Sequence, residues 1–374
     1  MEAAAPARQH GSPIARASLL AYICLIVYAS WFPFTGWRVS GLPPLSYLTA
    51  GLPHYWTRFD VLVNVIGYVP FGVLLVFAVY PRVRGLWAVL LASLTGVLVS
   101  GSMEAVQTFL PSRVPSVLDL LTNSLGCALG AVYGALKVRA YLEQGRLLQL
   151  RQRWFAPHAS QGLVLVALWP LAEIYPQSYL FGHGQILPEI SEWLSALLET
   201  PVDPGAFLRR DDLLTAEQYW LSETIITACQ MTGAVLVMLC LLRREAPRAR
   251  LILAMLGAAI VVKCLASAVL FEPESAFGWI TPGAQGGFVI GLIMIAGLAF
   301  APKTAQRRLA VLSLGLSLLV LNAIPVNPYF IATMQTWTQG QFLNFNGAAQ
   351  FLSLLWPFVA LWFLILPSHK LNKS

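Results

Sequence analysis

The sequence predicts an all-α protein that crosses a membrane about ten times. Only 11% of its residues are charged and 57% are hydrophobic, whereas a soluble domain has about 25% charged residues. So few charges cannot cover the surface of a water-soluble globule. Disorder requires low hydrophobicity and is excluded as well. Soluble and nucleic-acid-binding classes are therefore ruled out, and membrane lipids are the expected surroundings.

Ten apolar runs are long enough, or nearly so, to cross a bilayer as helices. Hydrocarbon about 30 Å thick needs roughly 20 helical residues. The apolar character is continuous, whereas the strands of a membrane barrel alternate with a period of two. The predicted spans are 17–35, 61–80, 86–109, 117–136, 161–176, 223–242, 250–271, 284–301, 307–325 and 347–366.

The basic residues orient these spans. With the N-terminus in the cytoplasm, alternation places 18 of the 24 Lys and Arg residues inside and five outside, and Lys263 falls within a span. Cytoplasmic segments of membrane proteins are enriched in Lys and Arg. The sequence therefore predicts an inner or plasma membrane protein with both termini, 1–16 and 367–374, in the cytoplasm.

The spans divide into two predicted units. A four-helix unit, 17–136, is followed by a basic cytoplasmic linker, 137–160, whose leucines can face lipid while its arginines face head groups. A six-helix unit, 161–366, carries an outer loop, 177–222, in which Pro188 opens an amphipathic helix expected on the membrane surface. The aromatic outer segment 327–346 is expected to anchor at the interface.

Three carboxylates stand at span ends that alternation places on the outer side. Each has an amide three or four residues further along the same helix, which predicts side-chain pairs. The pairs are Asp60–Asn64, Glu104–Gln107 and Asp119–Asn123. Arg113 lies in the short loop between the third and fourth spans. The sequence thus predicts one polar cluster at the outer leaflet of the first four spans.

The same residues carry a resemblance. The segments that hold them read DVLVNVIGYVPFG from Asp60, MEAVQTFLPSR ending at Arg113, and LDLLTNSLGCALG around Asp119. In order and spacing these segments resemble the VanZ-like family of membrane proteins, over about residues 18–136. The resemblance implies an envelope protein. The family's namesake is associated with low-level resistance to the glycopeptide teicoplanin.

The polar cluster leaves several functions open. We expect it to engage a lipid- or glycan-linked envelope component. Alternatively, its groups tie the helices together through buried hydrogen bonds, the chain transports or flips an envelope lipid, or it is an enzyme acting on a lipid-linked substrate, with Glu104 or Asp119 as general base near Arg113. No His, Ser or Cys constellation names a reaction, so a non-catalytic role is favoured. No metal or cofactor is expected, because the chain has no Cys/His cluster.

Two further patterns concern helix packing and charge. Gly126, Gly130 and Gly134 recur every four residues, which predicts close packing of the fourth span. Lys263 lies inside the seventh span, where it either extends towards the interface or pairs with a carboxylate, for which Glu173 is the candidate. A proton relay or binding of a substrate anion is the alternative role for this lysine.

Overall fold

The computed structural model describes residues 12–32, 34, 36–39, 41–53, 56–142, 146–157, 159–206, 214–271, 277–325 and 343–366, without the side chains of 59, 146–148 and 343–347. Throughout these ranges the chain forms helices and no sheet, with one isolated bridge between Phe155 and Leu242. The predicted all-α class is confirmed. The predicted tail 367–374, most of the tail 1–16 and most of the aromatic segment 327–346 lie outside the described residues.

Eight helices in the described ranges are long and apolar enough to cross a membrane. They are α1 (Pro13–Trp31), α2 (Arg58–Val79), α3 (Gly85–Gln107), α4 (Val117–Leu142), α8 (Ala216–Leu241), α9 (Arg248–Leu270), α11 (Lys303–Ala323) and α13 (Leu343–Ile365). Two shorter apolar helices occupy the other two predicted positions: α10 (Pro282–Leu298), and α6 (Ser160–Leu168) continued by the 3₁₀ helix η2 (Pro170–Ile174).

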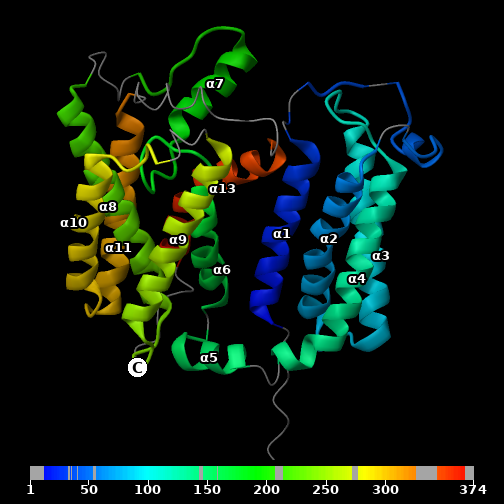
Figure 1. The fold of residues 1–374 in the computed structure, drawn as a ribbon, viewed down its shortest axis with the longest axis horizontal. Helices are drawn as coiled ribbons and strands as arrows, with labels where there is room; N and C mark the ends of the chain where they lie inside the picture. Colours follow the sequence, from blue (N-terminus) through cyan, green and yellow to red (C-terminus); the bar gives the residue numbers. More distant parts are fainter. Residues whose placement is uncertain are drawn as a thin grey trace, which may run out of the picture. The chain divides into compact units, whose positions relative to one another are not determined.

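The chain divides into two compact units, Met1–Arg153 and Trp154–Ser374. In the first unit α2 packs along α4, α3 packs against α4, and α1 contacts α2 and α3 (Figure 1). A short 3₁₀ helix, η1 (Ser46–Leu48), lies in the loop between α1 and α2. The short helix α5 (Arg146–Trp154), which has the basic residues Arg151 and Arg153 in its last turn, follows α4.

Glycines bring α2 and α4 unusually close together. A Cβ atom at Gly126 would overlap the carbonyl oxygen of Val65, and one at Gly130 would overlap the carbonyl oxygen of Val69. From the other helix, a Cβ at Gly72 would overlap the carbonyl of Cys127. Backbones without side chains between them gain van der Waals contact, which is the main attraction between helices in lipid. The predicted role of the glycine repeat in close packing is confirmed.

In the second unit α8 is the central helix. It packs between α10 and α11, and 83% of its most apolar stretch is buried (Figure 1). Gly287 and Gly291 of α10 face the backbone of α8 at Thr224 and Ala228. A helix that is apolar on all sides belongs inside a bundle, and α8 occupies that place.

The segment after α6 differs from the sequence-based expectation. The predicted fifth span, 161–176, corresponds to the nine-residue α6, which begins one residue earlier, and the five-residue η2. A helix of nine residues rises about 14 Å. The chain then continues without regular structure from 175 to 185, and residues 179–184 are buried rather than exposed as an outer loop. Pro170 cannot continue the α-helical hydrogen bonding, which explains the change of helix type.

The rest of the predicted outer loop contains α7 (Ile186–Leu198), as expected from Pro188. No residue of α7 is buried, and Trp193, Leu197 and Leu198 are exposed. Asn322 of α11 holds its first turn, because its Oδ1 accepts hydrogen bonds from the backbone N–H groups of Ile186 and Leu187 at 2.9 and 3.0 Å. The amphipathic helix is thus present and tethered at its start.

Candidate functional site

The polar residues predicted in the first unit gather at one end of its four helices. Asp60 lies in the first turn of α2, Glu104 in the last turn of α3 and Asp119 in the first turn of α4. Arg113 lies between α3 and α4 and contacts the end of α1. The prediction that they share one end is confirmed; the side of the membrane on which that end lies stays a prediction.

The predicted pairs along single helices are wrong, because the amides bond across helices. Asn64 of α2 donates to Oδ1 of Asp119 on α4 at 2.9 Å, and Asp60 instead forms a capping box with Thr57, with bonds of 2.9 and 3.1 Å. A carboxylate in the first turn satisfies N–H groups that have no partner within the helix. Local capping therefore takes Asp60 away from Asn64.

The second predicted pair is broken in the same way. The Glu104 carboxylate is 3% exposed and accepts the backbone N–H of Ser116 at 2.7 Å. Gln107 donates to the carbonyl of Ser30, at the end of α1, at 2.9 Å. These bonds join α3 to the start of α4 and to α1. A buried carboxylate or amide has to find such a partner, since leaving one unmade costs about 1–3 kcal/mol.

Asn123 also bonds across helices. Its Nδ2 donates to Oγ of Ser100 on α3 at 3.0 Å, in place of the predicted contact with Asp119. Its Oδ1 is buried and has no hydrogen-bond partner among the described residues. Among the described residues, the amide oxygen of Asn123 is thus a buried acceptor without a hydrogen bond, between α3 and α4.

Arg113 closes the end of α1. Its Nε and Nη2 donate to the carbonyl of Phe32 at 3.0 and 2.8 Å, and Nη2 also donates to the carbonyl of Ala29 at 3.1 Å. Burial lowers the pKa of the guanidinium, while the nearby Tyr28 and Glu104 side chains raise it. Arginine stays charged in proteins, so a fixed positive charge lies beside the last carbonyls of α1, where the helix dipole is negative.

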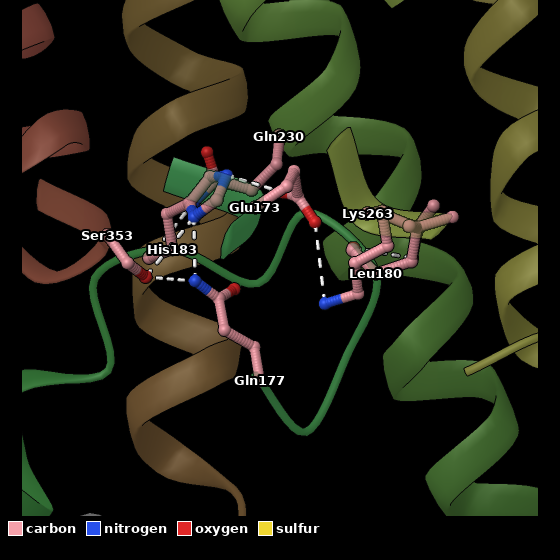
Figure 2. Close-up of polar contacts among 8 residues, drawn as sticks. Glu173, Gln177, Leu180, His183, Gln230, Lys263 and Ser353 are labelled. Carbon is pink, nitrogen blue, oxygen red and sulfur yellow. Dashed lines mark hydrogen bonds and ion pairs between the residues drawn. The ribbon is translucent and has the colours of Figure 1, made fainter. Parts of the chain in front are cut away.

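A second polar cluster, in the second unit, is made by Glu173, His183 and Lys263 with Gln177, Gln230 and Ser353 (Figure 2). Oε1 of Glu173 lies 2.8 Å from Nε2 of His183, and Oε2 lies 3.5 Å from Nζ of Lys263. Glu173 and His183 are fully buried and Lys263 is 3% exposed. The predicted pairing of Lys263 with Glu173 is confirmed, and the lysine does not extend to the interface.

Amide and hydroxyl groups surround His183. Its Nδ1 lies 2.8 Å from Nε2 of Gln177 and 3.3 Å from Oγ of Ser353, and Gln177 also contacts Ser353. Gln230 of α8 donates to the carbonyl of His183 at 2.8 Å. Ser353 lies in α13, four residues before Pro357. Because proline has no N–H, the carbonyl of Ser353 lacks the hydrogen bond that it would normally accept within the helix.

Sequence reasoning missed His183, because it placed residues 177–222 in an outer loop. Composition alone cannot distinguish a buried irregular segment from an exposed loop. One available signal was the length of the predicted fifth span, which is shorter than roughly 20 residues. Another was the low polarity of residues 179–184, Tyr-Leu-Phe-Gly-His-Gly, directly after it.

The fold and the hydropathy together define a multi-pass, all-α membrane protein. Residues 19–137 match the model of the VanZ/LLP1 family. This part of the chain, which contains all seven polar residues predicted for the first cluster, is a VanZ-like unit, so the resemblance seen in the sequence is confirmed. No curated protein and no solved structure that was compared with the chain matches it.

Proposed function

We propose that the VanZ-like unit binds the polar head group of an envelope lipid, or of a lipid-linked glycan, at the end where Asp60 and Asp119 lie. One observation carries the proposal: both carboxylates are reachable and, within the described part of the chain, neither forms an ion pair. Asp60 is exposed and Asp119 is half-buried.

The buried members of the cluster support these two carboxylates. Asn64 fixes Asp119 across the α2–α4 contact, and Glu104, Gln107 and Arg113 fix the ends of α1, α3 and α4. A binding group held by hydrogen bonds on packed helices keeps its geometry without a ligand. The same cluster can therefore hold the helices together and bind a head group.

The charge of the site indicates what it binds. Asp60 and Asp119 lie close enough for their charges to interact, and two negative charges favour donors: the hydroxyl groups of a sugar or the ammonium of an amine-bearing head group. A hydrogen bond to a charged group contributes about 1.5–3 kcal/mol, which is roughly 10- to 100-fold in a dissociation constant.

The experiment compares lipids retained by purified full-length protein. After mild detergent extraction, mass spectrometry should show an amine- or sugar-bearing lipid bound to the wild type and reduced at least tenfold in Asp119→Asn. The substitution keeps the size and the acceptor for Asn64 but removes the charge.

The exposed Glu245, outside the VanZ-like unit, provides the matched control Glu245→Gln, which should retain the lipid. If Asp119→Asn holds the same lipid in the same amount as the wild type, Asp119 is no part of a head-group site and the proposal is wrong. Size-exclusion profiles of all three proteins verify that the comparison is between folded chains.

Transport of such a lipid is the second candidate, and a different observation favours it. The segment 160–185 enters the second unit as a short helix, breaks at η2 and continues as a buried irregular chain. Irregular backbone at membrane depth is tolerated where it is buried in protein or lines a cavity, and broken helices are common at the substrate sites of transporters. Movement of labelled lipid across vesicles that contain the protein would distinguish transport from binding.

A further inference from the structure

We infer that Glu173, His183 and Lys263 form a proton-binding site in the second unit, at which His183 and Lys263 compete for the single carboxylate of Glu173. The site is separate from the proposed head-group site, because all of its residues lie outside the VanZ-like unit. Its ligand is the proton itself.

The first argument is a count of buried charges. One carboxylate lies between an imidazole at 2.8 Å and an ammonium at 3.5 Å, and all three groups are at least nine-tenths buried. A buried charge needs a partner, because uncompensated charge in a low-dielectric interior is very costly. With neutral histidine the cluster carries no net charge. A proton added to His183 makes two cations for one anion, so one of them has to give up the carboxylate.

The geometry indicates which cation leaves. The imidazole lies closer to the Glu173 carboxylate, at 2.8 Å, than the ammonium does, at 3.5 Å, so its hydrogen bond is the stronger one. His183 is held on a segment that packs against α8, α11 and α13, through Gln230, Asn322 and Ser353. Lysine is a flexible point charge on a long stem. Protonation of His183 therefore strengthens its bond to Glu173 and releases Lys263, whose long side chain can then carry the ammonium out of the interior, towards the end of α9 at Leu270.

The hydrogen bonds around His183 accommodate both states. In the neutral state Nε2–H donates to Glu173, and Nδ1 accepts from the Gln177 amide. In the charged state a new N–H bond forms at Nδ1 and needs an acceptor. Oε1 of Gln177 is buried and has no hydrogen-bond partner among the described residues. A half-turn of the Gln177 amide brings this oxygen to the new N–H, so the same residue serves both states.

Among the described residues, the ionisable side chain in contact with His183 is Glu173, which in turn contacts Lys263. The side chains that hydrogen-bond to residues 180–184 from α8, α11 and α13 are uncharged: Thr227, Gln230, Asn322 and Ser353. Tyr179, four residues before His183, faces two further titratable groups of α8, Tyr219 and Glu223. Trp169 and Trp356 flank the imidazole, each with its ring centroid 6.4 Å away.

The two tryptophans make the test possible. A cationic imidazole beside an indole interacts with its ring and quenches its fluorescence. We expect the fluorescence of purified full-length protein to fall as the pH is lowered, in a one-proton transition that is missing from His183→Gln. Lys263→Met removes the competing cation and should move the midpoint to higher pH by about one unit or more. Glu173→Gln should move it in the opposite direction.

The exposed Lys137 gives the matched control Lys137→Met, which should titrate like the wild type. A Lys263→Met profile that coincides with the wild type would overturn the inference, as would a transition that survives in His183→Gln. If His183→Gln does not fold, the protein labelled at its five histidines provides the measurement by nuclear magnetic resonance. One histidine signal must then shift its pH midpoint in Lys263→Met and keep it in Lys137→Met; the absence of such a signal contradicts the proton-binding site.

Discussion

At the scale of single residues, the polar groups of this protein bond preferentially to groups on other helices. Three amide side chains have a carboxylate three or four residues earlier in their own helix, yet each donates its hydrogen bond to a group on another helix. They are Asn64, Gln107 and Asn123. In lipid, a hydrogen bond between helices satisfies a buried group and joins two elements at once. The identity of the polar residues was therefore predictable from the sequence, whereas their partners depended on packing.

Basic residues have a similar double use. Arg248 donates to the carbonyl of Ala299 at the end of α10, and Arg307 donates to the carbonyls of Leu364 and Leu366 at the end of α13. The last carbonyls of a helix have no partner within it, and positive charge there complements the helix dipole. The predicted topology places these arginines on the cytoplasmic side. They therefore also supply hydrogen bonds to the last carbonyls of neighbouring helices.

Glu189 in α7 gives a pH-dependent prediction. Glu189 is half-buried, and this partial desolvation raises the pKa of its carboxyl above the ordinary 4.5, while the hydrogen bond from Gln350 lowers the pKa and the charge of Glu192 raises it. Because the folded state binds the proton more tightly than the unfolded state, the contribution of Glu189 to stability increases as the pH falls from neutral towards 4.5.

Glu189→Gln keeps an acceptor for Gln350 and removes this dependence. Thermal denaturation should show the variant more stable than the wild type at pH 7, with the difference shrinking towards pH 4.5. A difference that stays constant with pH would show that the shifted carboxyl does not contribute.

At the scale of helices, periodicity and composition predicted where the long apolar elements lie, and the glycine repeat predicted which helix packs closely. The interrupted segment 160–185 was not predictable in the same way. Its fold depends on Asn322 and Ser353, which are far away in the chain and supply partners for its backbone and for His183. A local pattern does not contain such distant partners.

The contact between α2 and α4 gives a prediction at this scale. Gly130→Ala forces a methyl group into the carbonyl of Val69, whereas nothing lies within 4 Å of the Cβ position of Gly67 on α2. Overpacking of this kind costs about 1–3 kcal/mol. Gly130→Ala should therefore lower the thermal midpoint in detergent by several degrees, and the control Gly67→Ala should leave it unchanged or raise it. Equal midpoints for the two variants would contradict the close contact.

At the scale of the whole molecule, the chain combines two units with different kinds of polar cluster. In the VanZ-like unit the carboxylates of Asp60 and Asp119 are reachable from outside the helices and form no ion pair with a described residue. In the second unit the ionisable groups of the cluster, Glu173, His183 and Lys263, are buried and in contact with one another. Reachable charges are suited to binding a head group, and buried charges in competition are suited to binding a proton. The first of these assignments is the central claim.

A photoreactive amino acid placed next to the polar end of the VanZ-like unit tests that claim most directly. Val114, beside Arg113, is 80% exposed, and Leu86, in the first turn of α3 at the opposite end, is 70% exposed. Illumination in membranes should link an amine- or sugar-bearing lipid to position 114 and enrich it there over position 86. The same link should be lost when Asp119→Asn is added. Equal labelling at the two positions, or labelling at 114 that is indifferent to Asp119, would contradict a head-group site at this end of the unit.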